Sequence, residues 1–597
     1  MRRALPLAIL LCAGLDTLLT RLALAHRPHD VALPLQLLVA WSVFGLLVAL
    51  PAWLTARWLH APFAACFGWL AGLVVVHHAA AARVRAADGP VLFAGATLLA
   101  ALVVVGGVLL LARLERRLAG RRWPGVMLLL VALLLLPPAD GLRSPPRPPA
   151  DAPSVARPNL LLLIWDTTRA DHLQPWGYDR AITPHLAQLA ERSATWEAAY
   201  SASVFTLSSH VSMLTGLPPS LHGTTLRHQG VTAESVASQL RAAGYRTGAF
   251  VGTSVLAAGR GLERGFDVYD DQVDPALCDS HVWALIHDAQ VVAARFVPAL
   301  RGNGNPNRPQ DFQRPAREVL DRALAWIREP DPRPWFAMIN LFDVHWPYLP
   351  SKDATALWVR DYAGPLNGYL FRSDSLAPGY RPDAADKQHI IDLYDGEMWE
   401  LDGAVDRFLG HVLDGPSPPD VLLTSDHGEA LGEGDHWSHD DLLLAQTRVP
   451  MLLLAPGRAE PGRREGPVSG VDVAATLLDL AGVAPEQDSV SLSHSLLAEA
   501  QPGRTLFEDD LDNLRATNDA HAVIRGRLRL TRRNGRETLN DALADPLDEH
   551  DLSAAHPEEA AELRKMLDSL LAAAKAVDEG GALQNADALR ALGYIGN

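Results

Sequence analysis

The sequence predicts a chain of two parts, an N-terminal bundle of transmembrane helices and an α/β domain with a largely parallel sheet. Residues 1–138 are dominated by Leu, Val and Ala, in apolar runs that approach or exceed the roughly 20 residues needed to cross a bilayer. Further along, three apolar runs lead into acidic or histidine side chains, which is typical of buried parallel strands with a site at their carboxyl ends. The length of 597 residues leaves room for at least two such units.

The predicted transmembrane domain, residues 1–138, contains about five helices. Its apolar stretches cover residues 4–25, 31–54, 61–82, 91–112 and 123–138. The arginines favour an N-terminus on the cytoplasmic side, because this topology places the dense arginine group at 113–122 inside. Five crossings put everything after residue 140 outside the cytoplasm, whereas a fifth run that does not cross would leave it inside. The high Arg-to-Lys ratio and the Ala content favour a bacterial source. Together with the five predicted spans, they lead us to expect a multi-pass inner-membrane protein whose catalytic domain is periplasmic or extracellular.

Composition narrows the classes of partner and cofactor. Residues 139–157 are rich in proline and predict an extended linker between membrane and domain. The whole chain has a formal net charge of −16. Residues 1–150 carry 14 Arg, no Lys and 5 acids, a formal +9, so residues 151–597 carry −25. Nucleic acid is therefore an unfavourable partner. Only three cysteines are present, without a C-x-x-C pair, so neither a disulfide framework nor a cysteine zinc site is expected.

The three strand-like runs of the α/β domain place polar groups at one edge. Residues 159–165 form a continuous apolar run that ends at Asp166, and residues 421–429 run into Asp426 and His427. The third run, 335–348, has His345 just past its strand. Helical patterns lie between these runs, at 183–194 and 234–244. Because ligands bind beyond the carboxyl ends of such strands, the three polar clusters predict one shared site.

The order of motifs along the chain resembles the sulfatase family of the alkaline phosphatase superfamily. The matching segments are PNLLLLIWDTTRADHLQPWGY, FTLSSHVSMLTGLPPSLHG, NLFDVHWPY, YDGEMWELD and TSDHGEALGEGDHWSHDDLLLAQTRVPMLLLAPG. The C-terminal segments LNDALADPLDEHDLSAAHPE and ALRALGYIGN also resemble that family. The resemblance implies an alkaline-phosphatase-like α/β/α sandwich over residues 158–485, followed by a smaller C-terminal subdomain over 486–597.

The resemblance also implies a metal site. Asp166, Asp426 and His427 stand where the family has metal ligands, and the oxygen of Thr206 would complete the shell. The family commonly has a second acid directly after the first, but this chain has Thr167. One divalent cation is therefore expected, and Mn²⁺, Zn²⁺, Mg²⁺ and Ca²⁺ all remain open. The alternatives are a helix cap for Asp166 and an ordinary hydrogen-bonded loop for the other pair.

The nucleophile position departs from the family pattern. Sulfatases often read C-x-P-S-R or S-x-P-S-R there, and the Cys or Ser is oxidised to formylglycine. Here the stretch reads TLSSH, from Thr206 to His210. Threonine cannot yield the aldehyde because its Cβ carries an extra methyl group, so the unmodified hydroxyl is expected to attack, helped by the metal. Thr206 also stands at a predicted helix start, where an anion is favoured but where a simple N-cap is the competing interpretation.

Five further residues are candidates for catalysis or substrate contact. His439 stands where sulfatases often have Lys and could serve as a general acid. His345 resembles the family's substrate-binding histidine, and His436 and His210 are further candidates. Each histidine could instead be hydrogen-bonded in a loop. Arg169 either contacts the anionic ester or pairs with a neighbouring acid.

The expected function combines these features. A Thr nucleophile after about five N-terminal spans resembles lipoteichoic acid synthases and lipid A phosphoethanolamine transferases. We therefore expect a metal-dependent hydrolase or transferase that acts on phosphate esters or diesters, including lipid-linked ones, at the extracytoplasmic face. One alternative is a sulfuric ester hydrolase that does not use formylglycine. The other is a catalytically silent binding protein of the same fold.

Overall fold

The computed structural model describes most of the chain after residue 156. The described residues are 157–224, 233–271, 313–368, 380–439, 441–484, 492–499, 501, 503–510, 520–545 and 547–578. They all belong to one compact unit formed by Arg147–Val273 and Phe312–Asn597. The predicted transmembrane domain and nearly all of the linker lie outside the described residues. In the part of the chain that the structure describes, no helix is both long and apolar enough to cross a membrane.

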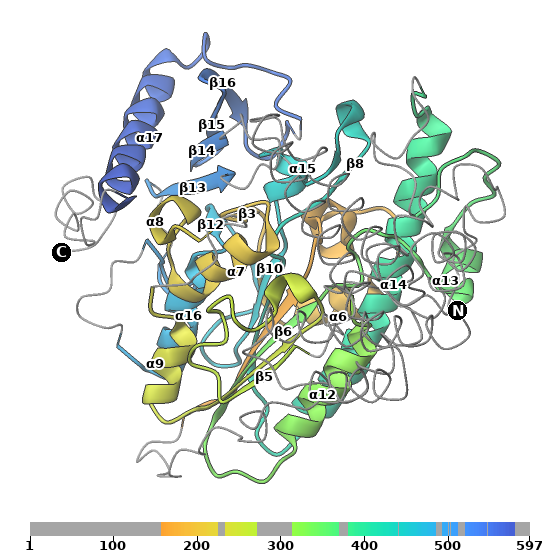
Figure 1. Ribbon diagram of the computed structural model, residues 1–597, viewed down its shortest axis with the longest axis vertical. Helices are drawn as coiled ribbons and strands as arrows, with labels where there is room; N and C mark the ends of the chain where they lie inside the picture. Colours follow the sequence, from red (N-terminus) through yellow and green to blue (C-terminus); the bar gives the residue numbers. More distant parts are fainter. Residues whose placement is uncertain are drawn as a thin grey trace, which may run out of the picture. The chain divides into compact units, whose positions relative to one another are not determined.

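An eight-stranded sheet forms the centre of this unit, in the order β11-β2-β10-β7-β1-β6-β4-β5 (Figure 1). Strand β10 runs antiparallel to both neighbours, and the remaining pairings in the sheet are parallel. The strands are β1 (Leu160–Trp165), β2 (Ala194–Trp196), β4 (Arg246–Val251), β5 (Val268–Asp270), β6 (Trp335–Leu341), β7 (Asp420–Thr424), β10 (Met451–Leu454) and β11 (Gly462–Arg464). The α/β fold with a largely parallel sheet is therefore confirmed.

The three predicted apolar runs are neighbours in this sheet. Strand β1 pairs in parallel with β6 on one side and β7 on the other. Its middle residue Leu163 lies opposite Ile339 and Leu423. Because the three strands are parallel and in register, their carboxyl ends meet at one edge, as the sequence predicts.

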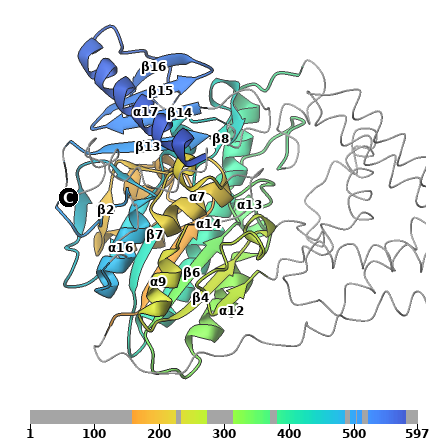
Figure 2. The same cartoon turned by 60° about the vertical axis from the view of Figure 1, so that its left-hand side comes forward.

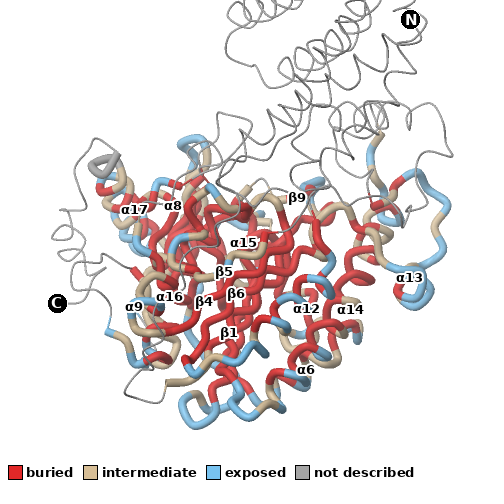
Figure 3. The backbone as a smooth tube through the Cα atoms, turned by 60° about the horizontal axis from the view of Figure 1, so that its bottom comes forward, coloured by how far each residue is buried: buried red, intermediate tan, exposed pale blue. Residues whose placement is uncertain are grey.

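Helices cover both faces of the sheet, because β1 is apolar on both. Its side chains alternate between two buried clusters, with Leu161, Leu163 and Trp165 in one and the intervening residues in the other. Figure 3 shows the strand among the buried parts of the chain. The first face is covered by α6 (Pro184–Glu191), α12 (Ala316–Ile327) and α14 (Ala384–Leu413), and the second by α7 (Thr206–Thr215), α9 (Val236–Ala242) and α16 (Asp472–Ala481). Shorter elements are α8 (Pro219–His222), α13 (Lys352–Trp358), α15 (Leu444–Thr447) and the strand pairs β3 (Ala199–Tyr200) with β12 (Val468–Ser469) and β8 (Ala430–Leu431) with β9 (Trp437–Ser438).

A second, antiparallel sheet follows near the C-terminus, and α17 (Pro557–Asp578) packs against it (Figure 2). Its strands, in spatial order, are β13 (Thr505–Asp510), β14 (Ala520–Arg525), β15 (Leu528–Arg533) and β16 (Arg536–Asp541). The β15–β16 hairpin turns at Asn534-Gly535, where both residues have positive φ, as a two-residue type I′ turn requires. This sheet lies in the predicted C-terminal subdomain, whose boundary at residue 486 stays a prediction.

Candidate active site

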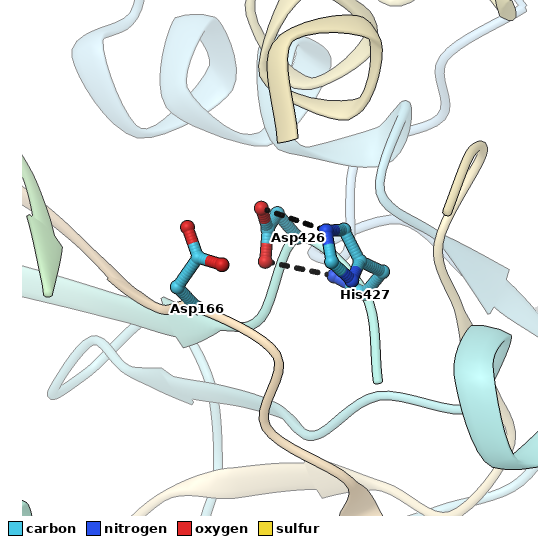
Figure 4. Close-up of side chains that lie close together, drawn as sticks. All are labelled: Asp166, Asp426 and His427. Atoms are coloured by element: carbon cyan, nitrogen blue, oxygen red, sulfur yellow. Dashed lines mark hydrogen bonds and ion pairs between the residues drawn. The ribbon is translucent and has the colours of Figure 1, made fainter. Parts of the chain in front are cut away.

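The ends of β1 and β7 bring three ionisable side chains together (Figure 4). Asp166 directly follows β1, and its backbone N–H donates to the Leu341 carbonyl at the end of β6, at 2.9 Å. Asp426 and His427 follow β7. All three are fully buried, and one possible ligand atom from each lies within 4.8 Å of the others. The structure therefore brings these three predicted residues together at the strand ends.

The electrostatics of this group fit a divalent cation. Asp166 Oδ1 and Asp426 Oδ2 are buried and have no hydrogen-bond partner among the described residues. Burial raises the pKa of Asp166 well above its usual range, and the neighbouring Asp426 carboxylate raises it further. Two buried carboxylates that face each other are unfavourable unless a positive charge lies between them. A cation would both neutralise the pair and bind the two unpartnered oxygens.

The remaining atoms of the three candidate ligands are held in place by neighbours. Asp166 Oδ2 accepts a hydrogen bond from Asn340 Nδ2 at 2.9 Å, and Asp426 Oδ1 accepts from the Thr167 N–H at 3.2 Å. His427 Nδ1 lies 3.0 Å from the Gly428 carbonyl oxygen, which can only accept. This contact places a ring proton on Nδ1, so Nε2 is the nitrogen that could bind a metal.

Thr206 lies beside this group as the first residue of α7. Its hydroxyl oxygen is 3.4 Å from His427 Nε2, and the side chain is buried. The N-cap position belongs to Phe205, whose backbone is extended, so the structure does not support Thr206 as a mere N-cap. The arrangement places the hydroxyl at the positive end of a ten-residue helix and against a candidate metal ligand.

His210 and Asn340 line the buried side of the site. His210 Nδ1 is 2.7 Å from the Thr206 carbonyl oxygen, and its Nε2 is 3.4 Å from Asn340 Nδ2. Burial lowers the pKa of His210, so the ring is neutral at neutral pH. Its contacts are with groups that position the nucleophile and Asp166. Sequence reasoning missed Asn340, although a single amide in the apolar run WFAMINL was a usable signal.

Two further histidines extend the site on the other side of His427. His439 Nδ1 lies 2.8 Å from the Val204 carbonyl oxygen, and His345 Nδ1 lies 2.6 Å from the Trp346 carbonyl oxygen. Both Nδ1 atoms therefore carry protons, while the two Nε2 atoms face each other at 3.3 Å. They can form a hydrogen bond only when one of them carries a proton. The ring centroids of His427 and His439 are 4.3 Å apart, so His439 is adjacent to the candidate metal group formed by Asp166, Asp426 and His427.

Arg169 and His436 occupy different surroundings from the other candidates. Arg169 is buried and pairs with Asp171 and Glu433, and its Nη1 also donates to the Glu429 carbonyl at 3.1 Å. Burial opposes its charge, but these two carboxylates outweigh that effect and raise its pKa. His436 is exposed in the turn between β8 and β9. Contact of either residue with substrate stays a prediction.

The backbone at Thr167 is unusual. Its φ is 52°, in the left-handed region that a β-branched residue rarely adopts. The side chain hydroxyl bonds the carbonyl oxygens of Asp166 and Val344, at 2.8 and 3.0 Å, while the N–H faces Asp426. Such strain persists only where the surroundings hold it, and it is frequent at functional sites.

Known proteins share sequence features or the fold of this domain. Arylsulfatase of Clostridium perfringens is 25% identical over 383 residues, which cover 58% of this chain and 79% of that protein. Choline-sulfatase of Rhizobium meliloti is 25% identical over 377 residues, covering 57% and 71%. The crystal structure of the phosphonate monoester hydrolase of Agrobacterium radiobacter shares the fold, with a TM-score of 0.53 at 18% identity over 70% of this chain and 96% of that one. The sulfatase family model matches residues 158–483, more than half of the chain, and the protein belongs to the sulfatase family.

Proposed function

We propose that the protein is a metal-dependent hydrolase or transferase that attacks phosphate esters or diesters with the hydroxyl of Thr206. One observation carries the proposal: the Thr206 oxygen lies 3.4 Å from His427 Nε2, beside two buried carboxylates with unpartnered oxygens. A nucleophile, an anion-favouring helix N-terminus and candidate metal ligands therefore share one small space.

Asp166, Asp426 and His427 would hold the cation. When bound, it would neutralise charge on the ester and make the threonine hydroxyl more acidic. The N–H groups of the first turn of α7 would face the oxygens of the ester. Thr206 would lose its hydroxyl proton to water and form the new bond to phosphorus, and the bond from phosphorus to the leaving oxygen would break.

His439 is the proposed general acid. Its Nδ1 proton is bound by the Val204 carbonyl, so Nε2 is the atom that can give a proton to the leaving oxygen. His345 lies at hydrogen-bond distance from that Nε2 and helps to hold it. Water would then release the phosphoryl group from Thr206 in a hydrolase, and an alcohol of an acceptor would do so in a transferase.

The membrane part of the proposal rests on the sequence. The apolar runs within residues 1–138 and the arginine distribution support a multi-pass inner-membrane protein of a bacterium with the catalytic domain outside the cytoplasm. A lipid-linked ester is the substrate that such an arrangement favours.

A sulfate ester is the second candidate substrate, and a specific observation favours it. The curated relatives at 25% identity are named arylsulfatase and choline-sulfatase. In that case Thr206 would attack sulfur with the same supporting residues. A catalytically silent domain is less favoured, because the unpartnered buried carboxylate oxygens are unfavourable in a site that binds nothing.

The test uses the full-length protein in detergent with 4-nitrophenyl sulfate, 4-nitrophenyl phosphate and bis(4-nitrophenyl) phosphate. We expect the phosphate esters to be turned over, Thr206→Ala to lose activity by about 10³-fold or more, and Thr206→Ser to keep part of it. Thr215→Ala, at the other end of α7, is the matched control. Mass spectrometry should find a phosphoryl adduct on Thr206.

The outcomes separate the candidates. Turnover of the sulfate ester alone would assign the second candidate substrate. Full activity of Thr206→Ala would exclude this residue as the nucleophile. Absence of metal from the purified protein, together with no turnover of any ester, would favour the silent domain.

A further inference from the structure

Gln446 lies on the short helix α15, fully buried, between the loop that carries His439 and the loop that carries His427. We propose that Gln446 is a positioning residue that fixes His439 over the nucleophile. The inference rests on the proposed role of His439. It adds a residue that touches neither the ester nor the metal.

The side-chain amide of Gln446 bridges the two flanks of His439. Its Nε2 donates to the Ser438 carbonyl at 2.9 Å, directly before His439. Its Oε1 accepts from the Asp441 N–H at 2.9 Å, two residues after His439. One partner can only accept and the other can only donate, so the orientation of the amide is unambiguous.

The backbone of the same residue holds the metal loop. The Gln446 carbonyl accepts from the Gly428 N–H at 2.7 Å, next to His427. A Cβ on Gly428 would lie 2.3 Å from the Ala445 carbonyl oxygen, so this close approach requires glycine. Gln446 thus joins the two loops that present His427 and His439, whose ring centroids are 4.3 Å apart.

The backbone conformation of Ser438 needs the hydrogen bond from Gln446. Its φ of 71° lies in the left-handed region, which is unfavourable for a residue other than glycine. A strained backbone conformation of this kind persists only where contacts with neighbouring groups hold it. The Gln446 amide provides such a contact, because it donates directly to the Ser438 carbonyl. Without that hydrogen bond, the chain before His439 can relax and carry the imidazole with it.

A small displacement of His439 would matter. The ring is tied to the nucleophile segment through the Val204 carbonyl and meets the edge of Phe205 at 5.9 Å between centroids. Its Nε2 must reach the leaving oxygen, and misplacement by about 1 Å can lower a rate by about 10²-fold.

The first test compares Gln446→Met, which keeps the volume and loses both hydrogen bonds, with Gln388→Met as the matched control. Gln388 donates to Asp392 within α14. With an alkyl phosphate, whose leaving group needs a proton, we expect kcat/KM of Gln446→Met to fall about 10–100-fold. With a 4-nitrophenyl ester the loss should be much smaller, and the metal content should equal that of the wild type. An equal loss on both substrates, or no loss, would overturn the proposal.

A double-mutant cycle with His439→Ala shows whether Gln446 acts through His439. We expect Gln446→Met to have little further effect once His439 is gone, because the two share one function. Independent, multiplicative losses would refute the inference. If His439→Ala itself keeps full turnover, the proposed function of His439 fails, which is a different result.

A chemical readout is independent of activity. The modification of His439 by diethyl pyrocarbonate, followed by peptide mass spectrometry, should be several-fold faster in Gln446→Met than in the wild type. An unchanged rate would contradict a positioning role. If Gln446→Met does not fold, Gln446→Glu, which keeps the acceptor for the Asp441 N–H, serves in all three measurements with the same criteria.

Discussion

Two regions of the active site are built in different ways. The main sheet positions the candidate metal group of Asp166, Asp426 and His427. Asp166 and Asp426 follow neighbouring parallel strands, and the register of those strands sets their positions. The His439 loop follows no strand of that sheet. It is held by side chains from elsewhere, namely Gln446 on α15 and Arg529 and Arg533 on β15.

The arginine contacts come from the C-terminal sheet. Arg529 is fully buried, pairs with the equally buried Glu508, and donates to the Leu442 carbonyl at 2.6 Å. Arg533 donates to the same carbonyl at 2.7 Å and pairs with Asp441 at 2.6 Å. The difference teaches that the proposed metal binding depends on the α/β sheet, whereas the proposed proton donation by His439 depends also on the second sheet. The two functions should therefore be separable by mutation.

The largest expected effect concerns the metal region. Asp426→Asn removes a charged ligand, so we expect activity to fall by about 10³-fold or more and the bound metal to be lost. Elemental analysis and turnover measure the two effects. Asp406→Asn, at an exposed position on α14, is the control and should change neither. Retention of full metal content in Asp426→Asn would remove this residue from the metal site.

The next largest effect concerns the His439 loop and the arginines of β15 that hold it. Arg529→Met leaves Glu508 buried without its partner, so we expect the free energy of unfolding to fall by about 3–5 kcal/mol. Urea unfolding measures this loss. Replacing both members of this pair, as Arg529→Met with Glu508→Leu, should recover part of it, while Asp548, the second carboxylate beside Arg529, keeps its ion pair with Arg533. Where the single variant remains folded, its metal content should stay normal while turnover falls. A parallel loss of metal would contradict the proposal that the metal region and the His439 region can be separated by mutation.

A pH effect is expected where α7 meets the C-terminal sheet. His222 is buried, its Nε2 lies 3.0 Å from Ser212 Oγ on α7, and burial lowers its pKa to about 4. The unfolded chain therefore takes up a proton near pH 6.5 that the folded chain takes up only near pH 4. Stability is fully present above the unfolded pKa and falls as the pH drops, by ~2 kcal/mol at about pH 5. His222→Gln should flatten this dependence in urea titrations at several pH values, and an unchanged slope would contradict it.

The smallest effect lies within the main α/β layer, away from both regions. Asp402 on α14 accepts hydrogen bonds from the backbone N–H groups of His185 and Leu186, at 3.0 and 2.8 Å, in the first turn of α6. Asp402→Ala should lower the free energy of unfolding by ~1 kcal/mol, as the loss of a helix cap does. Thermal unfolding measures it, and kcat and metal content should stay at their wild-type values. A larger effect on kcat than on stability would show that the first region is not independent of α6.

The same contrast explains what the sequence could predict. The strands, the helices after them and the shared position of Asp166, Asp426 and His427 follow from local apolar runs with polar ends, which are short-range signals. The start of α7 at Thr206 was also predictable. Gln446 and Arg529 carry no such signal, because they act on residues brought near only by the fold. For the same reason, the sequence could not decide whether Arg169 contacts the ester or forms ion pairs, or whether His436 lies in the site or at an exposed position.

The arginines of β15 have a practical consequence for the design of shorter versions of this protein. The family match ends at residue 483, which invites an expression fragment that stops there. Such a fragment would contain every candidate metal ligand and could bind a cation normally. It would lack Arg533 and Arg529, which bind the Asp441 carboxylate and the Leu442 carbonyl, and it would uncover the apolar contact of Val204, Phe205 and Leu442 with β14. A metal-loaded but inactive or aggregating fragment is therefore the expected product of cutting at the family boundary.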